Sequence, residues 1–374
     1  MQPSNRTSRR SFLVGTGAAF GAQLAAGARG AEPTPSPPAA GEAVRTAIAN
    51  APMAMKFTGR TAEEGRQWQA AFRSKLRELL GPCDPPQQWR TTVRSTAKLD
   101  GFRREDLLLE ADGFSSLPVY LLLPDNLSDR RAGIVALHGH GEFGHHAVVG
   151  RDDLPGVQQA IAGSNYDYGR QLARRGYVVA CPCLMPFGER LGKREAFGKQ
   201  DPCGDVFIRL LALGRVLMGE NLRDALWALN LLVSRPEVDP VKLGCVGLSL
   251  GGRMTMLTAA MEPRIKVAAV SGALNVMQER LSQPYGCGAQ IIPGLLQYGD
   301  VPEIGSLIAP RPAVWEVGSR DGLVKQPWAD EAVARMRRAY QAFSAPDRLL
   351  VDRFEGGHQW HGEVAYDVLN KTLA

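Results

Sequence analysis

The chain has 374 residues, of which 44% are hydrophobic and 22% are charged, a composition typical of a globular protein long enough for one large domain or two small ones. Its net charge of +6 comes largely from residues 1–30, which hold four arginines and no acidic residue, so that the remaining chain carries only +2. Such a small excess of positive charge argues against nucleic acid as a partner.

Residues 1–30 are predicted to be a twin-arginine signal peptide. Residues 8–13 (SRRSFL) contain the arginine pair, and a weakly apolar stretch rich in Gly and Ala follows, ending in small residues where cleavage could occur. The alternative is a disordered basic tail. Neither this stretch nor any later segment is long and apolar enough to span a membrane stably. We therefore expect a periplasmic or secreted protein whose partner is the twin-arginine export machinery.

Residues 31–41 (AEPTPSPPAAG) are rich in Pro and Ala, as linkers are. One domain over residues 42–374 is expected after it, beginning with a helical extension at 42–82. Within that extension, residues 42–80 are predicted to be helical, because Trp68, Phe72, Leu76 and Leu80 recur every four residues. Gly81-Pro82 ends the helix.

The rest of the domain starts with β structure and then alternates strands and helices. Two apolar runs at 107–109 and 119–123 flank the turn dipeptide Asp112-Gly113. The later strands are predicted at Gly133–Leu137, Tyr177–Ala180, Val241–Val246, Val267–Val270, Ala313–Val317 and Arg348–Phe354. The helices between them are predicted at Tyr168–Arg175, Asn221–Val233, Leu250–Met261 and Ala329–Phe343, with a last helix after His361. This order predicts an α/β fold with a mostly parallel, doubly wound sheet and antiparallel N-terminal strands.

Residues 245–253 read CVGLSLGGR and place Ser249 between Gly247 and Gly251, after one predicted strand and before one predicted helix. The G-x-S-x-G pattern in this context is typical of a nucleophile elbow, in which the serine hydroxyl is held out at a sharp turn. A helix N-terminus at that point favours a developing negative charge. The plain alternative is a Gly-rich turn with an incidental serine. We interpret Ser249 as a catalytic nucleophile.

A serine nucleophile needs a base, and the base needs a group that orients it. In chains with this elbow, an acid and then a histidine follow the serine, and only His358 and His361 follow Ser249. His358 lies in a flexible turn after the last predicted strand, so it is the predicted base, with His361 as the fallback.

The predicted acid is Asp321, which follows the strand at 313–317 in a loop. Its carboxylate could accept the Nδ1 proton of the histidine and stabilise the imidazolium. Asp-Gly is also a common turn pair, so Asp321 could simply belong to a turn. Glu316 is the competing acid, but it lies inside the strand.

Two backbone N–H groups are expected to hold an oxyanion. One is the N–H of Leu250, directly after the nucleophile, and the other is an N–H near Gly139 or His140, in the loop after an early strand. The glycines of that loop let the backbone approach a substrate closely.

The same loop has a rival interpretation as a metal site. His138, His140, Glu142, His145 and His146 lie within nine residues and could bind a transition metal, although this spacing matches no standard zinc pattern. The favoured expectation is an enzyme with no metal and no cofactor.

Two long Gly- and Pro-rich loops, at 184–206 and 275–309, are expected to shape the pocket. Trp315, Tyr285 and Tyr298 are candidates to line it. The chain has six cysteines. Those considered for disulfide pairing after export are Cys181, Cys183, Cys203 and Cys287.

At this point the chain resembles the α/β-hydrolase superfamily, in its bacterial branch of dienelactone-hydrolase-like and acetylxylan-esterase-like proteins. The stretches that carry the resemblance are the elbow together with LHGHG (137–141), LARRGY (172–177), FGER (187–190), RPEVD (235–239), APRP (309–312) and EGGH (355–358). The resemblance covers about residues 90–360 and implies Ser249, Asp321 and His358 as nucleophile, acid and base. One departure is Cys181-Pro-Cys183, where relatives often have an aspartate. Dienelactone hydrolases proper use a cysteine nucleophile, so the serine favours ester hydrolysis.

The sequence thus predicts an exported serine hydrolase that cleaves carboxylic esters of small molecules or carbohydrates through an acyl-enzyme. One alternative is a serine peptidase of the same fold, although no propeller-like repeat precedes the domain. The others are a metal-dependent hydrolase using the histidines of residues 138–146 and a binding protein on a hydrolase scaffold.

Overall fold

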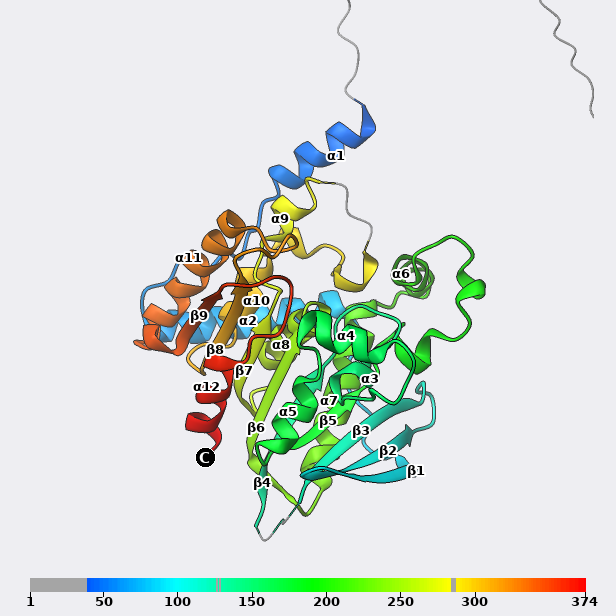
Figure 1. Cartoon of the computed structure of the whole chain (residues 1–374). Coiled ribbons are helices and arrows are strands. Elements are labelled where there is room, and N and C mark those ends of the chain that lie inside the picture. The colour runs from blue at the N-terminus through cyan, green and yellow to red at the C-terminus, as the bar shows by residue number, and fades with distance from the viewer. Residues whose placement is uncertain (1–38, 126, 128, 284–286) are drawn as a thin grey trace, which may run out of the picture.

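The computed structural model describes residues 39–125, 127, 129–283 and 287–374 (Figure 1). The predicted signal peptide at 1–30 and residues 31–38 of the predicted linker lie outside the described residues. The first described helix is α1 (Ala40–Ala49), which spans residue 42, the expected start of the single domain.

One sheet organises the described part of the chain, with its nine strands in the order β1-β2-β3-β5-β4-β6-β7-β8-β9. The strands are β1 (Arg90–Leu99), β2 (Phe102–Glu110), β3 (Leu117–Pro124), β4 (Arg131–Leu137), β5 (Val178–Pro182), β6 (Val238–Leu248), β7 (Ile265–Ser271), β8 (Ala313–Gly318) and β9 (Leu349–Phe354). The pairs β1-β2, β2-β3 and β3-β5 are antiparallel. The pairs β5-β4, β4-β6, β6-β7, β7-β8 and β8-β9 are parallel. The prediction of a mostly parallel sheet with antiparallel N-terminal strands is confirmed.

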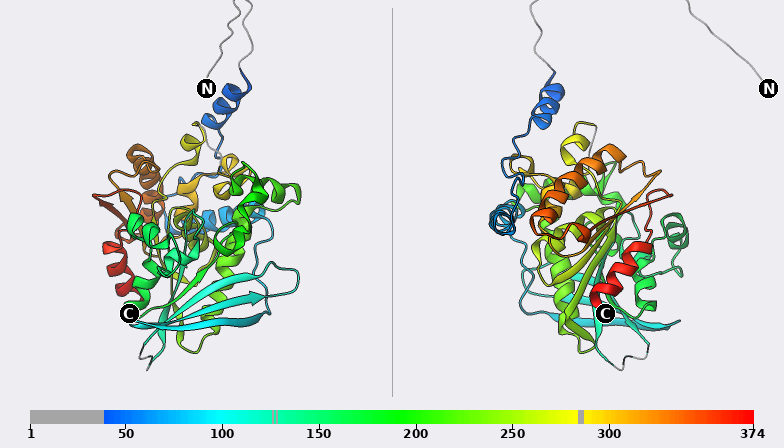
Figure 2. Two further views of the ribbon diagram at one scale, coloured as in Figure 1. Left: turned by 45° about the vertical axis from the view of Figure 1, so that its right-hand side comes forward. Right: turned by 90° about the vertical axis from the view of Figure 1, so that its left-hand side faces the viewer.

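Helices cover both faces of this sheet (Figure 2). On one face α7 (Leu217–Ser234) and α8 (Leu250–Met261) pack against the central strands. On the other face lie α5 (Tyr168–Arg174) and α12 (Glu363–Leu373). Each face therefore has its own apolar core, and nearly every side chain of α8 is buried, because the sheet lies on one side of it and other helices lie on the other.

The helical extension consists of two helices instead of the one predicted over residues 42–80. After α1 the chain is irregular until α2 (Ala62–Leu80). Pro52 accounts for part of the break, because a proline disfavours helical geometry in the residue before it. A capping box between Thr61 and Glu64 then starts α2. The apolar face of α2, which was predicted from its spacing, is buried at Phe72, Leu76 and Leu80.

The sequence pattern missed several short helices. These are α3 (His145–Val148), α4 (Val157–Ser164), α6 (Pro202–Ala212), α9 (Met277–Arg280) and α10 (Val301–Ser306). The predicted helix at 329–343 is present as α11 (Gln326–Ala342). In Figure 1, α6 projects from the body of the molecule, and it packs against the short 3-10 helix at Gly288–Gln290.

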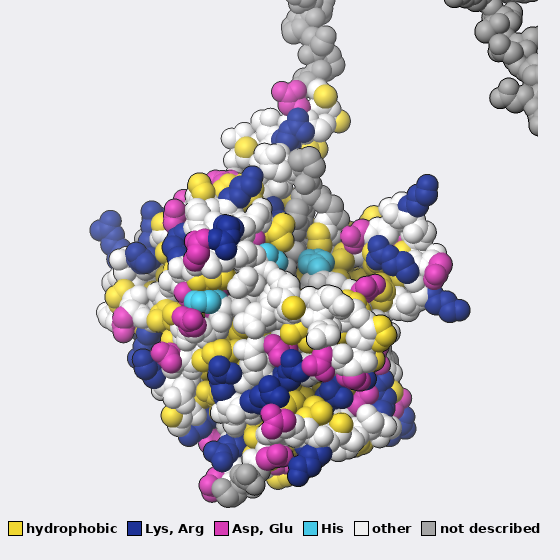
Figure 3. Space-filling view, viewed as in Figure 1, with side chains coloured by type: hydrophobic (Ala, Val, Ile, Leu, Met, Phe, Trp, Pro, Cys, Tyr) yellow, Lys and Arg dark blue, Asp and Glu magenta, His cyan; other side chains and the backbone are white. Residues whose placement is uncertain are grey.

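The surface matches the small net charge. Figure 3 shows acidic and basic side chains interspersed over one face of the molecule. None of the helices within the described ranges combines the length and the apolar character needed to cross a bilayer.

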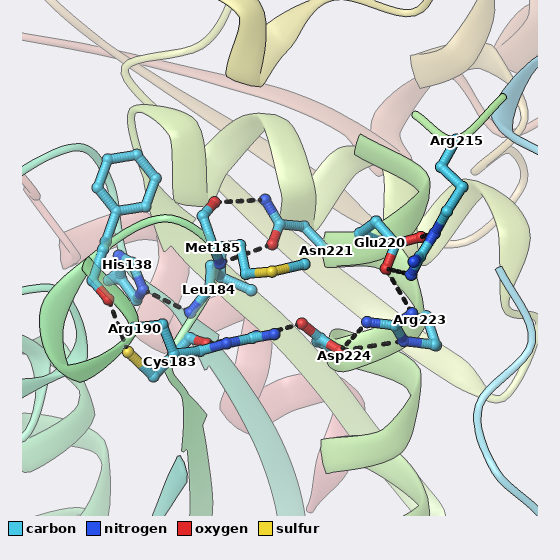
Figure 4. Close-up of polar contacts among 11 residues, drawn as sticks. His138, Cys183, Leu184, Met185, Arg190, Arg215, Glu220, Asn221, Arg223 and Asp224 are labelled. Carbon is cyan, nitrogen blue, oxygen red and sulfur yellow. Dashed lines mark hydrogen bonds and ion pairs between the residues drawn. The ribbon is translucent and has the colours of Figure 1, made fainter. Parts of the chain in front are cut away.

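A buried group of charged residues joins α7 to the segment after β5 (Figure 4). Arg190 Nη1 donates to Asp224 Oδ2 at 2.5 Å, and Arg223 Nη2 donates to Asp224 Oδ1 at 3.0 Å. Arg223 also donates to Glu220, which pairs with Arg215 as well. Since the Asp224 side chain is fully buried, Arg190 and Arg223 compensate its charge in place of water.

Asp224→Ala is expected to lower the free energy of unfolding by about 3–5 kcal/mol, because it removes the carboxylate partner of the buried Arg190 side chain and leaves Arg223 with Glu220 alone. The measurement is urea denaturation followed by circular dichroism. The control is Asp330→Ala, which removes an exposed pair with Arg353 and is expected to cost less than about 1 kcal/mol. Equal losses in the two variants would contradict the assigned role of Asp224.

Candidate active site

Ser249 lies between β6 and α8, which is the strand-to-helix context that the elbow pattern predicts. Its backbone has φ 64° and ψ −120°, a strained conformation for a residue with a side chain. The two elbow glycines explain how the turn can be so tight. A Cβ on Gly251 would lie 1.8 Å from the carbonyl oxygen of Leu137, and one on Gly247 would lie 2.5 Å from the backbone of Gly251.

His358 and Asp321 meet at the carboxyl ends of β8 and β9. His358 Nδ1 donates to Asp321 Oδ2 at 2.7 Å, and Asp321 Oδ1 accepts the Leu323 N–H at 2.8 Å. The Asp321 side chain is almost fully buried. His358 Nε2 is buried and has no hydrogen-bond partner among the described residues. The imidazole is therefore oriented through one nitrogen while the other remains available.

Ser249 and His358 line the same cavity, whose volume is about 320 Å³. The three side chains predicted to act together, Ser249, Asp321 and His358, are thus brought to one edge of the sheet from three separate loops. The other residues lining the cavity are His140, Ser164, Tyr166, Gly272, Asn275, Arg280, Cys287, Gln290 and Leu323. Most of these side chains are polar, but apolar atoms also form a large part of the wall, so the cavity offers hydrogen-bonding groups beside apolar surface.

Glu316 and His361, the alternatives to Asp321 and His358, form hydrogen bonds with other parts of the structure. Glu316 is fully buried and accepts the backbone N–H groups of His361 and Gly362 at 3.2 and 2.7 Å, and burial raises the pKa of its carboxyl group. His361 Nδ1 donates to Asp352 Oδ2 at 2.7 Å, and its ring stacks on Phe354 with centroids 4.3 Å apart. Neither Glu316 nor His361 lines the cavity of Ser249.

The predicted oxyanion donors have different surroundings. Leu250 is the first residue of α8, where backbone N–H groups have no partner within the helix. The Gly139 N–H already donates to the Tyr166 hydroxyl at 2.6 Å. His140 lines the cavity, so the N–H of His140 fits the second position better than that of Gly139.

The histidines of residues 138–146 do not form one metal site. His138 Nδ1 donates to the Gly139 carbonyl, and its Nε2 accepts the Leu184 N–H at 2.8 Å, so both ring nitrogens are used. His140 instead turns towards Cys287, with Nε2 2.9 Å from Sγ. The geometry separates these residues because the loop turns into α3 at His145, and this rival interpretation is therefore wrong for the five residues as a set.

The remaining two histidines lie against each other at the start of α3, with ring centroids 4.6 Å apart. Burial by itself would lower the pKa of His145, but Cys183 and Glu189 raise it to about 9. Burial and the neighbouring His145 lower the pKa of His146 to about 4. The Glu189 carboxylate, 3.3 Å from Nε2, thus favours the charged form of His145.

All six cysteines are free thiols in the structure. Among the four considered for pairing, only Cys203 and Cys287 lie in one cluster. Cys183 donates to the Phe187 carbonyl at 3.1 Å, and Cys181 is buried in β5.

The predicted pocket loops are partly confirmed. The 275–309 loop contributes Asn275, Arg280, Cys287 and Gln290 to the cavity. The 184–206 loop lines a second, smaller cavity of about 140 Å³ that shares His140 with the first. Trp315 is wrong as a lining residue, because it points into the core from β8. Tyr298 is also wrong, because it packs beside Lys75, and Tyr285 lies outside the described residues.

Tyr166 and Ser164 line the cavity but were missed by the sequence analysis. Tyr166 holds the Gly139 N–H, and burial raises the pKa of its hydroxyl above the usual range. No sequence signal marks either residue, because their chain segment reaches the cavity only through the packing of α4 and α5.

Fold and site together define an α/β hydrolase with a serine at the elbow. The family model of the dienelactone hydrolase family matches residues 144–284. YtaP of Bacillus subtilis (strain 168), which is provisionally named a hydrolase, is 30% identical over 263 residues, covering 68% of this chain and 82% of that protein. The chain belongs to the dienelactone hydrolase family, and the expectations of this family and of a hydrolase are confirmed.

Solved structures share the fold. A Bacteroides fragilis NCTC 9343 protein, provisionally described as an acetyl xylan esterase, aligns with a TM-score of 0.70 and 19% identity over 83% of this chain and 81% of its own. A glucuronoyl esterase from Solibacter usitatus aligns with a TM-score of 0.59 and 14% identity over 83% of this chain and 93% of its own. At these identities the likeness is one of architecture.

Gly251→Ala is expected to destabilise the protein by more than about 3 kcal/mol, because the added Cβ would overlap the Leu137 carbonyl and force the backbone apart. Denaturant unfolding of the purified variant measures this. Gly163→Ala in α4 is the matched control, because open space surrounds that helical position. It is expected to be neutral or to stabilise by up to about 1 kcal/mol. An unchanged unfolding midpoint in Gly251→Ala would rule out the close approach.

Proposed function

We propose that the protein is an exported serine esterase that hydrolyses carboxylic esters through an acyl-enzyme on Ser249. The observation that carries this proposal is the cavity that Ser249 and His358 both line, with His358 held by Asp321 at 2.7 Å and its other ring nitrogen without a hydrogen-bond partner among the described residues. A hydroxyl, an imidazole and a buried carboxylate in this relation are the parts of a nucleophilic triad.

In the proposed reaction, His358 Nε2 takes the proton of the Ser249 hydroxyl as the oxygen attacks the ester carbonyl. Asp321 keeps the proton on His358 Nδ1 and stabilises the imidazolium. The N–H groups of Leu250 and His140 donate to the oxyanion. His358 then protonates the leaving alcohol, and a water molecule, activated by the same imidazole, hydrolyses the acyl-enzyme and regenerates Ser249.

The cavity supports a substrate with a short acyl group and a polar alcohol. Its volume of about 320 Å³ lies at the lower end for small-molecule pockets, and Ser164, Asn275 and Gln290 offer hydrogen-bonding groups along its wall. The names of the structural relatives, an acetyl xylan esterase and a glucuronoyl esterase, agree with a carbohydrate ester. We propose such an ester as the substrate class.

Export rests on the sequence alone. The twin-arginine stretch at residues 8–13 supports a periplasmic or secreted location. A serine peptidase remains the second candidate from the sequence, since the proposed groups could also cleave amides.

A panel of acetyl through long acyl esters, acetylated sugars, lactones and short peptides separates these candidates. Turnover is expected to be highest for short acyl esters of polar alcohols. Ser249→Ala is expected to lower kcat at least about a thousandfold with little change in thermal stability, because the nucleophile is lost. Equal turnover by Ser249→Ala would exclude the proposed mechanism, and preferred cleavage of peptides would favour the peptidase.

Gly272→Ala tests the position of His358. A Cβ there would lie 2.7 Å from His358 Cε1, so the imidazole must shift. We expect kcat to fall roughly a hundredfold, as for a misplacement of about 1 Å. Gly113→Ala is the matched control, because Gly113 also has a positive φ of 78° but has open space around it. Steady-state kinetics of both variants, beside their melting temperatures, separate displacement of His358 from strain. Full activity in Gly272→Ala would contradict the assigned position of His358.

A further inference from the structure

Three metal-binding side chains meet at the wall of the active-site cavity. His140 comes from the loop after β4, Cys203 from the first turn of α6, and Cys287 from the segment before a short 3-10 helix at Gly288–Gln290. His140 Nε2, Cys203 Sγ and Cys287 Sγ all lie within 4.8 Å of one another. Residues so distant in the sequence meet here only because α6 folds over the 275–309 loop.

Local packing holds the two cysteines in place independently of any ligand. Asp201 caps α6 and accepts the Cys203 N–H at 2.7 Å, which fixes Cys203 in the first turn. Phe207 of α6 packs so closely on Gly288 that a Cβ there would lie 2.4 Å from the phenylalanine side chain. Cys203 is buried, while Cys287 and His140 both border the cavity of Ser249.

We propose that His140, Cys203 and Cys287 bind a thiophilic divalent metal ion, with Zn²⁺ as the best fit. Two thiolates and one imidazole are ligands that zinc prefers, and three protein ligands leave a fourth position open. Zinc with bonds of about 2.3 Å to sulfur and about 2.0 Å to nitrogen sets tetrahedral ligand atoms roughly 3.5–4 Å apart. The three ligand atoms, which lie within 4.8 Å of one another, are compatible with this spacing, and the contact of 2.9 Å between His140 and Cys287 needs to open by less than about 1 Å.

The site differs from the metal interpretation of residues 138–146 and from the expectation of no metal. Only His140 is shared with that interpretation, and the two sulfur ligands come from other loops. The ion would tie the loop that carries the His140 N–H to α6 and to the 275–309 segment. Its role is to hold the cavity wall, and the chemistry proposed for Ser249 does not pass through it.

The test uses the full chain, reduced, stripped of metal with a chelator and titrated with Co²⁺ under exclusion of air. One Co²⁺ per chain is expected, with the thiolate-to-cobalt charge-transfer absorption that sites without sulfur ligands lack. Cys203→Ser is expected to lose this absorption, and Cys83→Ser is the matched control, because Cys83 is also a buried thiol but lies outside the cluster. Zn²⁺ is expected to displace Co²⁺ and to raise the melting temperature of the wild type and of Cys83→Ser.

Cys287→Ser provides a second variant if Cys203→Ser does not fold, and it is also expected to lose the absorption. Ser249→Ala is expected to bind Co²⁺ like the wild type, so failure of the metal site and failure of the serine mechanism are distinguishable. The proposal is overturned if the wild type shows no charge-transfer band, or if the band persists in Cys203→Ser or Cys287→Ser. A disulfide between Cys203 and Cys287 that forms in place of metal binding, detected by peptide mass, overturns it as well.

Discussion

The contact between the first turn of α8 and the end of β4 is the constraint on which the rest of the site depends. Gly251 approaches the Leu137 carbonyl so closely that no side chain fits between them. The residue before the helix, Ser249, has a positive φ of 64° at this turn. The burial of α8 thus offsets the free-energy cost of the strained backbone at Ser249.

This contact also sets the electrostatics of the site. It places the N-terminus of α8, with its unpaired N–H groups, beside the loop after β4. The same loop is fixed from its other side, because His138 bonds through both ring nitrogens and Tyr166 holds the Gly139 N–H. The N–H groups that we propose as oxyanion donors therefore belong to backbone that is already held in place, which is the arrangement that favours catalysis.

The imidazole side of the site depends on backbone contacts as well. Two hydrogen bonds hold the loop directly after His358. The Ser271 hydroxyl donates to the Gln359 carbonyl at 3.2 Å, and the Trp360 N–H donates to the Ser164 carbonyl at 3.0 Å. His361 and Glu316, which the sequence offers as alternatives to His358 and Asp321, hold the base of this loop. Residues of a catalytic type, such as Glu316 and His361, can thus position a loop instead of taking part in a reaction. Their hydrogen-bond partners in the structure distinguish these two roles.

The strands, the helices beside them and the elbow could be predicted from the sequence, because hydrophobic periodicity and the spacing of glycines are local properties of the chain. The sequence also indicated that Ser249, Asp321 and His358 lie near one another, because each follows a predicted strand and parallel strands end at one edge of a sheet. The break between α1 and α2, the burial of Trp315 and the part played by Tyr166 were decided by tertiary packing. The meeting of His140 with Cys203 and Cys287 belongs to that second group as well, because it depends on how α6 folds over a loop that begins more than 60 residues later in the chain, and no local pattern encodes such a contact.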